Sequence, residues 1–109
     1  MAATSVQFVA PQFLPTTIGS SLYTVSTGTS QITSVVLANV NASSASCGYT
    51  LYVGGSGLNN AIFGNNVVLG PNEVTNIMSA VTIPSGTCIY GTCTIASGIT
   101  MHMSGIQYT

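Results

Sequence analysis

Five residues carry the side chains that proteins use most often for catalysis or metal binding: Cys47, Cys88, Cys93, His102 and Glu73. Their spacing supports little chemistry. The paired C-x₂-C spacing of zinc sites is missing, and so is the G-x-S-x-G turn of serine hydrolases. A cysteine–histidine nucleophile pair would lack an orienting partner, and one carboxylate cannot form an acid–base pair. The sequence predicts no catalytic residue, no metal site and no cofactor, and therefore no enzyme.

Each of these residues has a structural interpretation. Cys88 and Cys93 are five positions apart, so on one extended strand they point to opposite faces. A disulfide between them needs a tight turn at residues 90–92, and we expect free thiols in the core instead, with any pairing among the three cysteines left open. His102 points away from its two methionine neighbours and is expected to bond a neighbour within a strand. Glu73 follows Gly-Pro-Asn and is expected to be a solvated turn residue.

The charge content excludes further classes of function. The 109 residues include no Lys or Arg, and the charged fraction is 1%, against about a quarter in ordinary domains. Binding of nucleic acid is excluded because it requires cations to neutralise phosphates. No apolar run approaches the roughly 20 residues of a membrane span. The start MAATS resembles no secretory signal, so we expect either synthesis in a cytoplasm or an already mature chain. Nearly uncharged surfaces associate, which predicts a homo-oligomer, with a trimer as one option, over a weakly charged monomer.

Strand patterns recur at short spacing and helical periodicity is weak. The sequence predicts an all-β fold, a single antiparallel β-sandwich of about eight strands with a Greek-key or jelly-roll path. In residues 31–39 apolar side chains occupy both faces, which predicts a strand covered on both sides. Residues 47–53 alternate, which predicts that Cys47, Tyr49, Leu51 and Val53 point inward. The expected strands are residues 22–25, 31–39, 47–53, 61–63, 67–69, 73–78, 81–83, 87–90 and 99–108.

The first 20 residues differ from the rest. Pro11 and Pro15 favour an extended conformation, which predicts an N-terminal arm (1–20) that lies along the sandwich domain (21–109) or reaches a neighbouring subunit. An ordinary N-terminal strand with a linker is the alternative. If the arm is separate, deletion of residues 1–15 leaves the domain folded and weakens assembly. The candidate assembly contacts are the arm's apolar anchors, Phe8, Val9, Phe13, Leu14 and Ile18.

Four stretches carry a resemblance: residues 22–39 (LYTVSTGTSQITSVVLAN), 47–53 (CGYTLYV), 81–91 (VTIPSGTCIYG) and 99–106 (ITMHMSGI). Over residues 20–107 the chain resembles the small β-sandwich virion proteins of tailed bacteriophages, which are capsid decoration proteins or modules of tail and fibre proteins. The resemblance implies a virion protein made in a bacterial host cytoplasm, with itself and a major capsid or other virion protein as partners. The capsid exterior is favoured. The alternative is a tail or fibre module that binds a receptor glycan through the Asn- and Gly-rich loops at 54–60 and 64–66.

Overall fold

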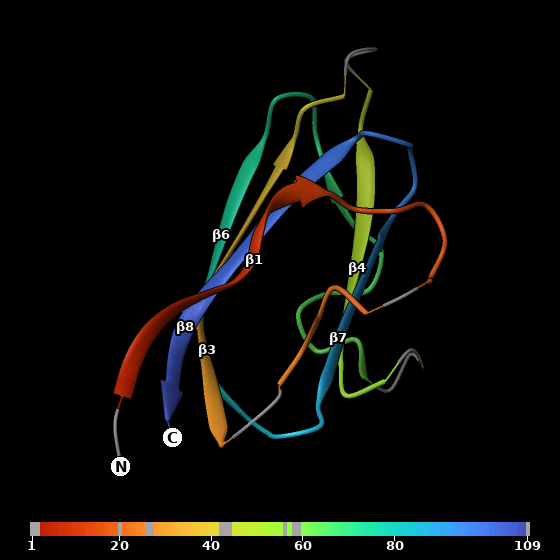
Figure 1. The fold of residues 1–109 in the computed structure, drawn as a ribbon. Coiled ribbons are helices and arrows are strands. Elements are labelled where there is room, and N and C mark those ends of the chain that lie inside the picture. The colour runs from red at the N-terminus through yellow and green to blue at the C-terminus, as the bar shows by residue number, and fades with distance from the viewer. Residues whose placement is uncertain are drawn as a thin grey trace.

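The structure is a computed structural model of the chain, and it describes residues 3–19, 21–25, 28–41, 45–55, 57 and 60–108. The described residues form eight strands, and Figure 1 shows that the strands lie in two layers. The all-β sandwich expected from the sequence is confirmed. In chain order the strands are β1 (Ala3–Phe13), β2 (Tyr23–Thr24), β3 (Thr29–Asn39), β4 (Cys47–Val53), β5 (Val67–Leu69), β6 (Val74–Pro84), β7 (Cys88–Cys93) and β8 (Ile99–Tyr108).

The strand order is that of a jelly roll. One sheet has the order β1-β8-β3-β6 and the other β2-β7-β4-β5, and all described pairs are antiparallel. The first strand pairs with the last, the second with the seventh, the third with the sixth and the fourth with the fifth. A long hairpin rolled into two sheets gives this pairing, which is the path of double-sheet jelly rolls.

The N-terminal segment is a strand of this sandwich. Residues Ala3–Phe13 pair with β8 along nearly its whole length, from Ala3 opposite Tyr108 to Phe13 opposite Thr100. Beyond β1 the chain crosses between the layers: the Leu14 N–H donates to the Ile99 carbonyl at 2.9 Å, and the Pro15 carbonyl accepts from the Cys93 N–H at 2.8 Å. This corrects the expectation of an arm set apart from the domain, because residues on both sides of the expected boundary at 20 share one sheet and one core.

A β-bulge changes which face of β3 is buried. Ser30 and Ile32 point into the core before it, and Val35, Leu37 and Asn39 do so after it. Relative to β8, Thr33 is the extra residue, and the inward positions therefore shift from even to odd numbers. The expectation that β3 is covered on both sides was wrong. The buried residues have even numbers before the bulge and odd numbers after it, so the sequence pattern shows apolar residues at both.

Two other segments differ from expectation. Residues 73–78 and 81–83 are not separate strands but parts of the continuous strand β6, whose pairing with β3 contains an irregularity at Ser79 and Ala80. Residues 61–63 form a turn, from which Phe63 enters the core. All seven residues of β4 are buried, although the sequence alternates. Its outward side is covered in part by Asn66, whose backbone N–H donates to the Thr50 hydroxyl at 2.9 Å.

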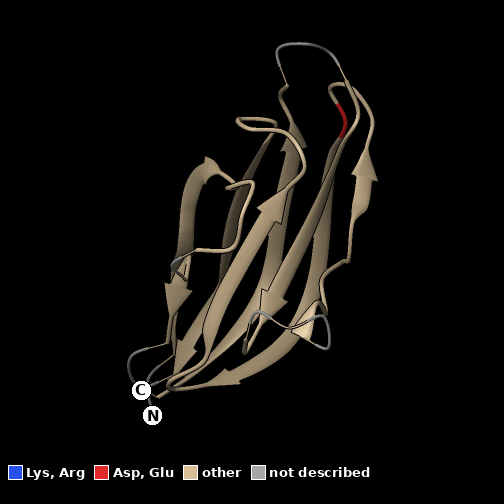
Figure 2. Cartoon of the chain, turned by 90° about the vertical axis from the view of Figure 1, so that its right-hand side faces the viewer, with Lys and Arg blue, Asp and Glu red and all other residues tan. Residues whose placement is uncertain are grey.

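The molecule is elongated, with principal extents of 47 × 24 × 18 Å. The first residues of β1 and the last residues of β8 are paired and lie at one end of the sandwich (Figure 1). Glu73, the one charged side chain, lies near the other end (Figure 2). Among the described residues there is no helix of the length and hydropathy that a membrane span requires.

Candidate assembly surface

The five expected assembly contacts separate into two groups. Phe8, Val9 and Leu14 are buried within the chain's own core, at 6%, 1% and 1% exposure. The Phe8 ring lies 5.2 Å from the Tyr23 ring, so it joins the edge strands β1 and β2 of the two sheets. These three residues are therefore corrected from assembly contacts to core residues. Phe13 and Ile18 are 51% and 41% exposed and stay candidates.

A second set of exposed apolar side chains was not predicted from the sequence. Val67 and Val68 on β5, and Val74 and Met78 on β6, are all exposed, Val74 and Met78 at 64% and 73%. Only four residues, 70–73, join β5 to β6, so the two strands form edges on the same side of the sandwich. We call these four side chains, with the outer backbone edge of β6, the β5–β6 side. The available signal was the absence of any charged residue from the 11 positions 74–84.

Glu73 holds the turn at the start of this side. Its Oε1 accepts a hydrogen bond from the Gly70 N–H at 2.6 Å, and its own N–H donates to the Gly70 carbonyl at 3.1 Å. The side chain is exposed, as expected of a turn residue. Asn72 adopts a positive φ of 62° in the same turn, a conformation that Asn tolerates better than most residues. The Glu73 carboxylate therefore stabilises the turn between β5 and β6.

Asn39 fixes the same turn from inside. This amide is 2% exposed. Its Nδ2 donates to the carbonyls of Ala45, Leu69 and Gly70 at 2.9, 3.0 and 3.0 Å, and its Oδ1 accepts from the Asn41 N–H at 3.1 Å. A single buried side chain thus links the end of β3, the loop before β4 and the turn that leads into β6.

The cysteines lie in different surroundings. Cys47 and Cys93 are buried, Cys88 is half-buried, and all three are free thiols. The Cys93 thiol lies within hydrogen-bond distance of the Leu14 and Ile95 carbonyls, at 3.2 and 3.1 Å. Burial raises the pKa of Cys93 above its ordinary value, whereas an activated nucleophile requires the opposite shift. Burial therefore disfavours the thiolate form that Cys93 would need to act as a nucleophile.

His102 and its methionine neighbours behave as alternation requires. Met101 and Met103 are buried at 1% and 0% exposure, and His102, opposite Val36 on β3, is on the outer face and half-buried. Within the described part of the chain, no three His, Cys, Asp or Glu side chains form a group that could hold a metal ion.

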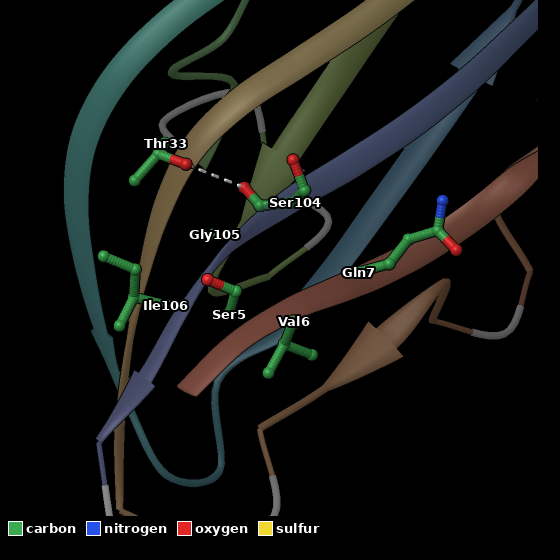
Figure 3. Close-up of a pocket in the computed structure, with 7 residues that line it drawn as sticks. All are labelled: Ser5, Val6, Gln7, Thr33, Ser104, Gly105 and Ile106. Atoms are coloured by element: carbon green, nitrogen blue, oxygen red, sulfur yellow. Dashed lines mark hydrogen bonds between the residues drawn. The ribbon is translucent and has the colours of Figure 1, made fainter. Parts of the chain in front are cut away.

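A hollow of about 480 Å³ lies on the outer face of the sheet that contains β1, β8 and β3, as Figure 3 shows. It opens where the strands change register, and the Thr33 hydroxyl donates to the Ser104 carbonyl at 3.4 Å beside it. Its lining is uncharged, with hydroxyl, amide and aliphatic side chains, so it offers hydrogen bonds without electrostatic attraction. The lining residues are Ser5, Val6, Gln7, Thr33, Ser104, Gly105 and Ile106.

Comparison with known proteins adds no family to this geometry. No protein-family model matches the chain, and no curated protein matches it either. A function for this chain is therefore inferred from its fold and from the chemistry of its surface.

Proposed function

We propose that this chain is a virion structural protein of a tailed bacteriophage, a decoration or cement protein that binds the exterior of the capsid. The observation that carries the proposal is a jelly roll with an almost uncharged surface. Its one carboxylate holds a turn, and four of its exposed large apolar side chains lie on the β5–β6 side. Double-sheet jelly rolls occur in viral capsid proteins. The fold alone makes a virion role plausible only by analogy, and the chemistry of the surface supports it independently.

The physical task of a cement protein is to bury surface across a junction between capsid subunits. Hydroxyl and amide groups on sheet faces make direct hydrogen bonds, and exposed apolar side chains contribute about 25 cal/mol for each Å² removed from water. A standard specific interface buries about 1,600 Å² in total. A homo-oligomer that contacts several capsid subunits at once adds avidity to that contact. None of these contributions requires a cation or a catalytic group.

The hollow of Figure 3 favours a second candidate, a tail or fibre module that binds a glycan. Sugars are recognised by hydroxyl and amide groups such as those of Ser5, Gln7 and Thr33. This candidate predicts a low copy number for each particle and direct sugar binding. The glycan loop expected at 54–60 includes positions outside the described residues.

The two candidates are separated by locating the protein on particles. An antibody to the purified chain, bound to gold, is applied to phage particles from the bacterium that produces them and viewed by negative-stain electron microscopy. Labels spread over the head support the decoration role, and labels confined to the tail support the glycan-binding module. Particles without label contradict both. A phage that lacks the gene should, on the decoration proposal, release its DNA at lower temperature than the parent phage.

A further inference from the structure

The four edge strands of the sandwich differ in how they are protected against pairing with another chain. Sheet edges are normally blunted by short length, bulges, Pro or charge. In the described residues β2 and β5 are only two and three residues long, and β1 contains Pro11 and two register shifts. β6 has 11 residues and no charged side chain, and its one proline, Pro84, is the last residue. Its one irregularity, at Ser79 and Ala80, lies beyond the regularly paired residues 74–78, so β6 is the long edge with the least protection.

The outward backbone groups of β6 follow from its pairing with β3. The Asn39 N–H donates to the Glu73 carbonyl at 2.9 Å, which makes this a hydrogen-bonded position of the antiparallel ladder. Residues of such a ladder alternate in direction, so Val74, Asn76 and Met78 direct their N–H and C=O groups away from β3. These groups form a row along the outer edge, upstream of the irregularity at Ser79.

The absence of charge favours another copy of the same chain as the occupant of this edge. The β6 strand has no ionic group with which to select a charged partner, and none with which to repel its own kind. The long sides of the molecule measure at least 47 by 18 Å between their extremes, so a contact along one of them has room for the roughly 800 Å² that each partner contributes to a standard interface. A partner that pairs along β6 also covers Val74 and Met78, which are otherwise exposed.

We propose that two copies of this chain pair antiparallel through β6, about a two-fold axis at Asn76. The four-stranded sheets of the two copies then form one continuous sheet. In this register Asn76 faces its counterpart and Val74 faces Met78 of the other copy, which gives three residue pairs that each exchange two backbone hydrogen bonds. The interface is isologous, as two-fold symmetry requires. The two Glu73 carboxylates are about 20 Å apart, beyond the roughly 8 Å screening length at physiological salt. The pairing deepens the proposed function and rests on it in one respect: the decoration role involves a homo-oligomer, and β6 pairing would form that oligomer.

The test compares two double variants that differ at one position. Val74→Lys with Met78→Lys places like charges opposite each other at two points of the interface, and this opposes pairing. Val74→Lys with Met78→Glu places opposite charges at the same points and restores it. Thr4→Lys, an exposed change on the edge strand β1, is the control for an added charge. Molar mass is measured by light scattering during size-exclusion chromatography, and circular dichroism establishes that each variant is folded.

We expect the unmodified chain, the control and the Lys–Glu variant to share a molar mass that is an even multiple of 11.0 kDa, and the Lys–Lys variant to have half of it. A Lys–Lys variant that keeps the parent mass overturns β6 pairing, while self-association and the virion role remain. A trimeric parent also overturns it. A monomeric parent overturns it as well, and leaves the edge for a strand of another virion protein, which gold labelling of particles tests independently.

Discussion

Replacement of Asn39 by Ala should destabilise the fold more than any other single amide substitution in the described residues. The side chain is buried and makes four hydrogen bonds, with the carbonyls of Ala45, Leu69 and Gly70 and with the Asn41 N–H. Each such bond contributes about 0.5–1.5 kcal/mol net, and a buried group left without its partner costs more. The two N–H groups of the amide are shared among three carbonyls, so the contributions are not fully additive.

The expected loss in the free energy of unfolding is therefore about 3 kcal/mol. For a domain of this size, it corresponds to a fall in the melting temperature of roughly 10–15 °C. Denaturation by guanidinium chloride, followed by circular dichroism and by tyrosine fluorescence, measures the loss, because the chain has five Tyr and no Trp. Because Asn39 binds the turn that leads into β6, the same variant should also associate more weakly.

Two further variants make this reasoning refutable. Asn65→Ala removes the same amide from an exposed position and should cost less than about 0.5 kcal/mol. Asn39→Asp keeps the shape but faces three carbonyls with a carboxylate, so it should be less stable than Asn39→Ala at neutral pH. Burial beside carbonyls raises the pKa of the new carboxyl, so the variant should regain part of its stability as the pH falls toward about 4. If Asn39→Ala costs no more than Asn65→Ala, the amide does not fasten the turn.

Four other outcomes are expected. Gly105→Ala should cost about 3 kcal/mol or more, measured by the same denaturation, because its added Cβ would meet a backbone carbonyl of β3 and the ring of Phe8. Ser30→Ala should leave stability unchanged or raise it by up to about 1 kcal/mol, since the buried hydroxyl has no partner in the described structure; a clear loss would reveal a bond to that hydroxyl. Burial raises the pKa of Cys93 and of Tyr49 above 9.0 and 10.0, so the folded state favours their protonated forms, and the denaturation midpoint should fall as the pH rises above about 9, less steeply in Cys93→Ala. Deletion of residues 1–15 should abolish the cooperative unfolding transition, because it removes β1 with three core side chains that each contribute about 2–5 kcal/mol, comparable in sum to the stability of a whole domain.

The fold class was accessible from the sequence because strand alternation is a local property. Cys47, Tyr49, Leu51 and Val53 were predicted to point inward, and the structure confirms it. The inversion of faces in β3 was not accessible, because a bulge depends on how the neighbouring strands are paired. No property of Thr33 alone marks it as the extra residue.

The assembly surface was predicted less well, for a reason that concerns proline. Pro11 and Pro15 indicated an extended segment, and the segment is extended, but they could not show whether it pairs. Pro11 is tolerated in β1 because that strand is an edge and its pairing with β8 shifts register between Val9 and Gln12. Proline is excluded from central strands but not from an edge strand. Pro11 is therefore compatible with β1, even though β1 contributes Phe8 and Val9 to the core.

The lack of charge has opposite consequences for the core and for the edge. Inside the sandwich it costs nothing, because buried side chains are apolar in most proteins and the buried amide of Asn39 is fully bonded. On the surface, the lack of charge removes the electrostatic repulsion that usually keeps copies of a protein apart. The strand β6 has neither charged side chains nor the short length that protects a sheet edge. A freely diffusing monomer with this edge would be prone to uncontrolled pairing. On the proposed virion role, assembly into an ordered shell would occupy the edge, and this would explain both the uncharged composition and the weakly protected strand.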